Sequence, residues 1–231
     1  MTSGRRFNDV RIRLRRLNQT TLKLYNSSDY GAALVKAIEA GDLAMHMPKS
    51  DPEVLSALMN LAGIQETRAE YGDAESAWCS IRELPPELGD EGHDLQNDVL
   101  GHLGSIYASQ GKDDKAEEMY RELVEHQIVK LGPKHSEYLT TLNNLAVICG
   151  NRGKYEEVEN LLKCVASARS EVLGPKHPET AAALNNLAVL YHKTERYVEA
   201  EASLSHALEI LAATVGTEHP NYQTSLASLR V

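Results

Sequence analysis

Four histidines recur at a spacing that suggests metal ligands. His93, His135, His177 and His219 follow one another at intervals of 42 residues. Helices packed in neighbouring structural units place equivalent atoms on the order of 10 Å apart, whereas a metal-bound nitrogen lies about 2 Å from its ion. Adjacent histidines therefore do not reach a shared ion. We predict no metal site and no cofactor, and we expect each histidine to begin a helix and satisfy its exposed backbone groups.

No other group of residues predicts an active site. The sequence contains no GxSxG element, no glycine-rich phosphate loop, no HExxH helix and no nucleophile with an identifiable base. The paired acids Glu117-Glu118 and Glu156-Glu157 are expected on exposed helix faces as solvated charge, and Cys149 is expected in the core. We therefore predict that the chain is not an enzyme.

Asparagines form a second column with the same interval. Asn60, Asn144 and Asn186 share one position, His102 takes it in the intervening unit, and Asn143 and Asn185 stand beside it. Asparagine is a poor helix former because its side chain competes for backbone hydrogen bonds. Its repetition suggests either an amide bridge between neighbouring units or an amide that matches the backbone of an extended peptide. The two explanations are compatible.

An internal repeat positions both columns. Residues 131–172 and 173–214 agree at 16 of 42 aligned positions and share the block LNNLAV. The period continues in both directions, through Leu58, Leu100, Leu142, Leu184 and Leu226. In the second half of each unit a small residue precedes a large one by four, as Ala74 precedes Trp78. A fixed period of this length predicts stacked helix pairs.

The repeat array is predicted at residues 45–231. Its units are expected at 51–84, 93–130, 135–172 and 177–214, followed by a partial helix at 219–231. Asp51 and Pro52 suit a helix start, because Asp caps free N–H groups and Pro lacks one. Gly111 and Gly153 predict turns between the two helices of their units. The partial helix suits either a C-terminal cap or an array that continues.

Residues 1–44 are predicted as a basic N-terminal arm and a degenerate first helix pair that caps the array. Residues 5–16 hold six arginines and one acidic residue, Asp9. Apolar residues at helical spacing predict an amphipathic helix, and a second helix is expected to end at Gly41. Terminal units of repeat arrays are atypical, which suits a cap. Two alternatives remain, an Arg-rich mitochondrial transit peptide and an arm that binds nucleic acid or lipid.

The 42-residue frame, the connection LGPKHP and the helix phrase LNNLA resemble the tetratricopeptide repeats (TPR) of kinesin light chains and similar proteins. The resemblance covers residues 51–231. It implies an all-α fold, a helix-pair solenoid wound as a right-handed superhelix. In peptide-binding members of this class, the Asn before the Leu of the first helix lines a concave groove. The resemblance implies that role for Asn60, Asn144 and Asn186. Kinesin light chain repeats recognise short cargo motifs with acidic and aromatic residues.

Side chains on the same helix face predict the charge of such a groove. Glu66 and Glu70 make the first clear repeat acidic, whereas later repeats are mildly basic. An acidic stretch of a partner would therefore be steered to the C-terminal half. We predict a groove for a protein or peptide, lined by Asn60, His102, Asn143, Asn144, Asn151, Asn185, Asn186, Lys193 and Arg196.

Composition restricts the class of protein. The net charge of −9 opposes a nucleic-acid-binding solenoid, which needs a basic stripe, so we predict no nucleic-acid partner. No run approaches the roughly 18 apolar residues of a membrane span. Three cysteines without CxxC spacing indicate a reduced intracellular protein. We predict a cytoplasmic location, or a mitochondrial one if the N-terminus is a transit peptide.

These features predict a non-enzymatic protein–protein interaction scaffold. Two alternatives have a sequence basis: a sensor or regulatory repeat module of a larger signalling NTPase, and a mitochondrially targeted TPR protein. An enzyme with an unrecognised site ranks last, because no catalytic motif occurs.

Overall fold

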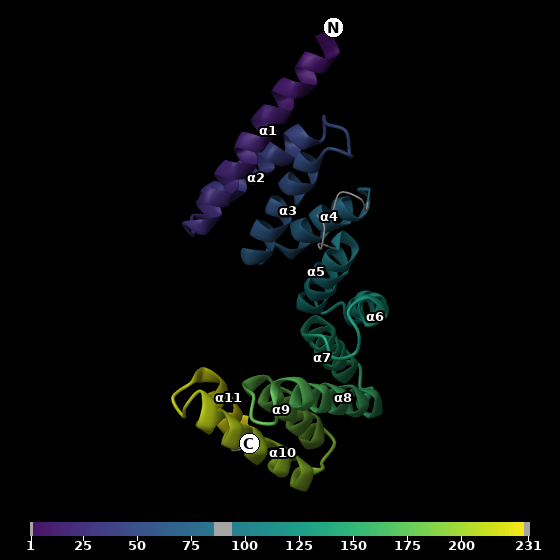
Figure 1. Ribbon diagram of the computed structural model, residues 1–231, viewed down its shortest axis with the longest axis vertical. Coiled ribbons are helices and arrows are strands. Elements are labelled where there is room, and N and C mark those ends of the chain that lie inside the picture. The colour runs from purple at the N-terminus through teal and green to yellow at the C-terminus, as the bar shows by residue number, and fades with distance from the viewer. Residues whose placement is uncertain (1, 86–93, 229–231) are drawn as a thin grey trace. The chain divides into compact units, whose positions relative to one another are not determined.

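The computed structural model describes residues 2–85 and 94–228, and this part of the chain is all-α. It contains eleven helices and no strand (Figure 1). Each helix packs against the next within two compact units, an N-terminal unit of Met1–Lys112 and a C-terminal unit of Asp113–Val231. The predicted all-α class built from consecutive helix pairs is confirmed.

The N-terminal unit consists, in its described part, of α1 (Thr2–Asn26), α2 (Tyr30–Ala44), α3 (Pro52–Thr67), α4 (Tyr71–Arg82) and α5 (Leu95–Ser109). Helix α1 packs on both α2 and α3, and the order then continues from α2 through α3 and α4 to α5. Leu103 of α5 is 1% exposed, so the leucine that recurs in each repeat faces the interior of the unit.

The C-terminal unit comprises α6 (Asp113–Lys130), α7 (Ser136–Asn151), α8 (Tyr155–Leu173), α9 (Pro178–Lys193), α10 (Tyr197–Thr214) and α11 (Pro220–Ser228). These helices pack in chain order from α6 to α11. Leu145 and Leu187, the counterparts of Leu103, are 2% and 5% exposed. Among the described residues, no helix combines the length and the apolar character that a membrane span requires.

Two of the recurring histidines begin helices, as predicted. The backbone N–H of Glu137 donates to His135 Nδ1 at 3.3 Å, and that of Glu179 donates to His177 Nδ1 at 3.2 Å. Each histidine therefore satisfies a donor that the first turn of a helix leaves unpaired. The capping role is confirmed at α7 and α9, whereas His93 lies outside the described residues.

The turn inside each helix pair uses the same backbone conformation. Ala69, Gly111, Gly153 and Glu195 stand 42 residues apart and have positive φ angles of 58°, 70°, 73° and 60°. Glycine adopts this left-handed conformation without the steric cost that other residues carry. The turns predicted at Gly111 and Gly153 are confirmed, and the other two turns keep the conformation with less suitable residues.

The expectation that the second helix ends at Gly41 is wrong. Helix α2 continues to Ala44, and Gly41 lies buried within it. A Cβ atom at Gly41 would stand 3.4 Å from Leu61 Cδ2 of α3, a tight contact. Glycine at this position therefore permits close packing between two helices and does not end one.

The arginine-rich helix α1 is joined to the rest of the N-terminal unit. Leu14 is fully buried on its inner face. Three exposed arginines of α1 form ion pairs: Arg11 with Asp51 at 3.2 Å, Arg13 with Glu39 at 2.8 Å and Arg15 with Glu53 at 2.5 Å. Three of the six arginines thus contact acids of α2, of α3 or of the residue that caps α3.

Candidate functional site

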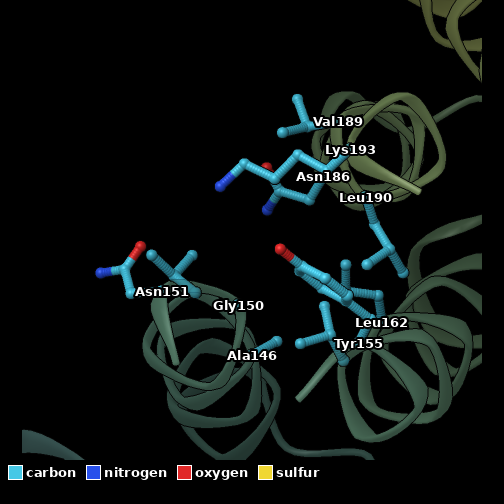
Figure 2. A pocket seen from close by; sticks show the side chains of 11 residues that line it. Ala146, Gly150, Asn151, Tyr155, Leu162, Asn186, Val189, Leu190 and Lys193 are labelled. Atoms are coloured by element: carbon cyan, nitrogen blue, oxygen red, sulfur yellow. The ribbon is translucent and has the colours of Figure 1, made fainter. Parts of the chain in front are cut away.

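A pocket with a volume of about 110 Å³ opens in the C-terminal unit between α7, α8 and α9 (Figure 2). Its buried lining is aliphatic and consists of Ala146, Val158, Leu162 and Leu190. Its exposed lining adds Val147, Asn151, Tyr155, Val189 and Lys193. An apolar floor with a few polar groups at its mouth is the usual composition of a ligand pocket.

Gly150 lines the pocket and adds no side chain to it. The corresponding positions of the other repeats hold Glu66, Ala108 and His192. A Cβ atom at Gly150 would meet only Val158 Cγ2, at 3.9 Å, which is ordinary contact. Alanine would therefore fit at this position, whereas a longer side chain would occupy the pocket.

Three of the predicted groove residues meet at the mouth of the pocket. Figure 2 shows Asn151 of α7 to the left of the Tyr155 ring, and Asn186 and Lys193 of α9 above the ring. Asn151 Nδ2 donates to Asp113 Oδ1 at 3.4 Å. Lys193 is exposed and has no ion-pair partner within residues 2–85 and 94–228.

The asparagine column bridges two neighbouring repeats. Asn186 Nδ2 donates to Asn143 Oδ1 at 2.7 Å, and both residues are half-buried. This bond joins α9 to α7, as the interhelical explanation of the column predicts. The amide of Asn186 keeps its carbonyl oxygen and one further N–H for another partner, because a side-chain amide offers two donors and an acceptor.

The other predicted residues of the C-terminal unit do not line the pocket. Asn144 and Asn185 are half-buried on α7 and α9, and the buried Oδ1 of Asn185 has no hydrogen-bond partner among the described residues. Arg196 begins α10, where its guanidinium lies 4.3 Å from the centre of the Tyr191 ring.

The charge of Arg196 is committed to ion pairs. Its Nη1 lies 2.7 Å from Glu159 Oε2, and its Nε lies 2.9 Å from Glu199 Oε1. Hydrogen bonds from Arg196 and Lys163 lower the pKa of Glu159 to about 2. Arg196 therefore stabilises the contact between repeats, and the lysine of the pocket is the more available cation.

The two predicted residues of the N-terminal unit lie in a different environment. His102 of α5 stacks on Trp78 of α4 with ring centroids 4.1 Å apart, and its Nδ1 lies 3.0 Å from Glu66 Oε2. The Trp78 indole N–H also donates to Glu66. Asn60 is half-buried on α3, and its buried Nδ2 has no hydrogen-bond partner in the described part of the chain.

The expectation that Glu117 carries solvated charge is wrong. Glu117 is 5% exposed and accepts from Lys154 Nζ at 2.6 Å, from Arg121 Nε at 2.8 Å and from Arg152. Burial opposes its ionisation, but these hydrogen bonds outweigh burial and lower the pKa of Glu117 to about 2. The helix pattern did not reveal the burial, because Arg152 and Lys154 come from the following repeat.

The ligand atoms of Glu117, Cys149 and Glu157 lie within 4.8 Å of one another. Three basic side chains already surround Glu117, so this cluster is an ion-pair network and does not have the charge that favours a cation. Burial raises the pKa of the Cys149 thiol to about 11. A thiol with so little thiolate near neutral pH is unsuited to nucleophilic chemistry, in agreement with its expected place in the core.

The sequence prediction missed the apolar part of the site. Val147 and Val189 stand 42 residues apart on α7 and α9 and are 50% and 43% exposed. Tyr155 adds a ring that is 39% exposed. Two features of the sequence could have indicated this part of the site. The two valines recur at the repeat interval, and Gly150 stands where the other repeats have larger residues.

Comparisons with known proteins agree with this architecture. A tetratricopeptide repeat family model matches residues 95–170, 152–213 and 179–229, which together span more than half of the chain. A comparison with curated protein sequences gives no match.

Several solved structures have a similar fold. BtubC (BKLC) from P. vanneervenii has 22% identity and a TM-score of 0.65, with 94% of this chain and 81% of that chain covered. A Podosopora anserina putative kinesin light chain with nearly identical TPR-like repeats has 20% identity and a TM-score of 0.75, with coverage of 88% and 96%. YrrB, a TPR protein with an unusual peptide-binding site, has 17% identity and a TM-score of 0.62, with coverage of 93% and 91%. The chain belongs to the tetratricopeptide repeat family, and its fold is similar to that of kinesin light chain-like members.

Proposed function

We propose that this chain is a protein-interaction scaffold that holds an extended segment of a partner protein across α7 and α9. The observation that carries the proposal is the pocket of about 110 Å³, with aliphatic side chains inside and two amides and a lysine at its mouth. An extended segment presents apolar side chains for such a floor and backbone groups for such amides.

The family supports this function. Tetratricopeptide repeats are typically non-catalytic, and repeat arrays of this kind offer extended surfaces to protein partners. YrrB, one of the similar structures, is described as having a peptide-binding site. The likeness to YrrB supports the fold, and the pocket supports the function in this chain.

Affinity in this arrangement comes from preorganisation. Asn186 is held by its hydrogen bond to Asn143, and the buried lining belongs to helices whose backbones are already paired. The protein therefore loses little conformational freedom when a ligand binds, so more of the contact energy appears as affinity.

The charge of the surface favours a partner with a carboxylate near the pocket. Lys193 offers an ammonium group at the mouth, whereas Lys154 and Arg196 are occupied by Glu117 and Glu159. The net charge of −9 opposes association with nucleic acid. We therefore propose a protein or peptide partner with an acidic residue beside its anchoring side chain.

The test fills the pocket without changing its surroundings. Gly150→Leu places a side chain in the pocket, and Gly150→Ala adds only a Cβ atom that meets Val158 at 3.9 Å. Ten-residue peptides are selected from a displayed random library on the full chain, and their dissociation constants are measured with both variants. We expect Gly150→Leu to weaken binding about ten-fold or more and Gly150→Ala to leave it within about two-fold, because a filled pocket loses the anchor.

Both variants should fold at least as well as the natural chain, because glycine is the weaker helix former by about 1 kcal/mol. Circular dichroism melts verify this point. Equal binding by the Leu variant and the Ala variant, with both folded, would show that peptides bind elsewhere and would refute the proposed site.

A further inference from the structure

We propose that the pocket accepts one aliphatic side chain of leucine or methionine size and excludes an aromatic anchor. The proposal rests on the proposed function and specifies the ligand of the same site. It differs from the acidic and aromatic motif that the resemblance to kinesin light chain repeats suggests. The arguments come from the size, the lining and the charges of this pocket.

Size is the first argument. An enclosed apolar cavity of about 150 Å³ holds a benzene molecule. The pocket between α7, α8 and α9 measures about 110 Å³, so it is smaller than that cavity, and it is open at its mouth. An indole or a phenol ring would leave part of its surface outside the pocket, whereas leucine and methionine have only four side-chain heavy atoms and need less room. The Tyr155 ring of the protein already forms one wall of the space (Figure 2).

The chemistry of the lining is the second argument. Ala146, Val158, Leu162 and Leu190 form the buried lining, and none of them has a polar side-chain atom. Buried tryptophan and tyrosine normally place their N–H or O–H group against a hydrogen-bond partner. An indole N–H directed to this floor would lose its water and gain no acceptor, which disfavours it. An aliphatic side chain has no such group.

The charges at the mouth of the pocket favour an acidic residue next to the anchor of the ligand. On the α9 side, Lys193 offers an exposed ammonium group. On the α7 side, Asn151 contacts the carboxylate of Asp113. A carboxylate next to the anchor is therefore attracted towards α9 and repelled from the α7 side. The ligand is an extended segment with one aliphatic anchor and an acidic neighbour directed at Lys193.

The first step of the experiment is the selection on the full chain described above. Peptides that the Gly150→Leu variant no longer binds are aligned, and the residue common to them is the anchor. One enriched peptide is then synthesised with Leu, Met, Ala or Trp at the anchor, and anisotropy measures each dissociation constant. We expect Leu and Met to bind within about three-fold of each other. Ala and Trp should bind about ten-fold or more weakly, because the first leaves the pocket empty and the second does not enter it.

The acidic neighbour is tested by a double-mutant cycle. Replacing the acidic residue of the peptide with its amide should weaken binding to the natural chain. The same replacement should have no effect on Lys193→Gln, because the charge partner is gone. Equal losses with both proteins would show that the carboxylate does not meet Lys193 and would overturn that part of the proposal.

The outcomes separate this inference from the proposed function. If selected peptides lose binding to Gly150→Leu but carry an aromatic anchor, or if the Trp peptide binds as well as the Leu peptide, the scaffold function stands and the aliphatic specificity is refuted. If no selected peptide responds to Gly150→Leu, both the proposed site and its specificity are refuted. Peptide variants leave the protein unchanged, so misfolding does not confuse this comparison.

Discussion

Equivalent positions of the two units are used in opposite ways. In the C-terminal unit, Gly150, Leu162 and Asn186 surround an open pocket. Their counterparts 84 residues earlier, Glu66, Trp78 and His102, are a carboxylate, an indole and an imidazole that contact one another. The N-terminal unit thus fills with its own side chains the space that the C-terminal unit leaves free.

At these three positions, the side chains differ between a set that contact one another and a set that line an open pocket, which is the binding site that we propose. The left-handed turn is shared between the two regions, and α3 and α7 both have 16 residues, whereas the side chains at these positions differ. A carboxylate that accepts from two aromatic donors satisfies its own hydrogen bonds and stabilises the unit. A glycine at the same position leaves a space unfilled, which costs packing energy, and we propose that a ligand fills this space.

The largest expected effect comes from removing the side chain that fills the N-terminal space. Trp78→Ala should lower the free energy of unfolding of that unit by about 3–5 kcal/mol, because the indole is 2% exposed and its loss leaves a cavity. Trp78→Phe keeps a ring and loses the N–H donor, so it should cost less, about 1–2 kcal/mol. Urea titration followed by circular dichroism measures both variants. A cost below about 1 kcal/mol for the alanine variant would contradict the view that this cluster is a packed core.

The sequence predicted the features that depend on neighbouring residues in the chain better than those that depend on several helices. The repeat period predicted helix starts at His135 and His177 and turns at Gly111 and Gly153, because capping and left-handed turns depend on one residue and its neighbours in the chain. The cap formed by residues 1–44 stays a prediction, and the buried Leu14 supports it.

Features that depend on several helices were harder to predict. Asn151, Asn186 and Lys193 were chosen for their polarity, whereas the pocket that they line also depends on aliphatic residues of three helices and on Gly150, which adds no side chain. Periodicity assigns residues to a face, but it does not reveal an empty volume, which results from all the surrounding side chains together. For the same reason the ion pairs of Arg196 escaped the prediction.

The second prediction compares two glutamates that each accept more than one hydrogen bond. Glu117 of the C-terminal unit contacts three cations, whereas Glu66 contacts one indole and one imidazole. Glu117→Gln should cost about 2–3 kcal/mol near neutral pH, because Lys154 loses its anion and Arg121 and Arg152 each lose one of two carboxylate partners. The exposed neighbour provides the control, and Glu118→Gln should change stability by less than about 0.5 kcal/mol.

The effect of Glu117 should depend on pH in a defined direction. Its pKa is about 2 in the folded chain, below the ordinary value of 4.5, so the unfolded chain takes up the proton first as pH falls. The stabilisation is complete above about pH 4.5 and is lost between pH 4.5 and 2, so the natural chain and Glu117→Gln should converge there. Circular dichroism at each pH measures the difference between the two chains, and a pH-independent difference would contradict the assignment.

The third prediction separates the bridging role of the asparagines from their proposed contact with a ligand. Asn143→Ala and Asn186→Ala both break the hydrogen bond of 2.7 Å between α7 and α9. Each should therefore lower the free energy of unfolding by a similar amount, about 0.5–1.5 kcal/mol. Only Asn186 lines the pocket, so only its replacement should weaken peptide binding directly, by about ten-fold. Asn144→Ala should leave binding unchanged. Equal losses of affinity for the Asn143 and Asn186 variants would indicate that the amides act only through the scaffold.

The smallest expected effect concerns what the two units share, the left-handed turn inside each helix pair. Ala69 and Glu195 carry a Cβ atom at φ angles of 58° and 60°, which costs roughly 1–2 kcal/mol relative to glycine. Glycine also makes the unfolded chain more flexible, which offsets about half of this gain. Ala69→Gly and Glu195→Gly should therefore each stabilise the chain by about 0.5 kcal/mol.

Gly153→Ala is the matched reverse change, since a Cβ atom there meets nothing within 4 Å and only the backbone conformation is tested. It should destabilise by about the same amount in thermal melts. If one of the changes Ala69→Gly and Glu195→Gly stabilised the chain and the other destabilised it, the turn would differ in conformation between the two units. The side chains of the two units could then not be compared on a shared backbone.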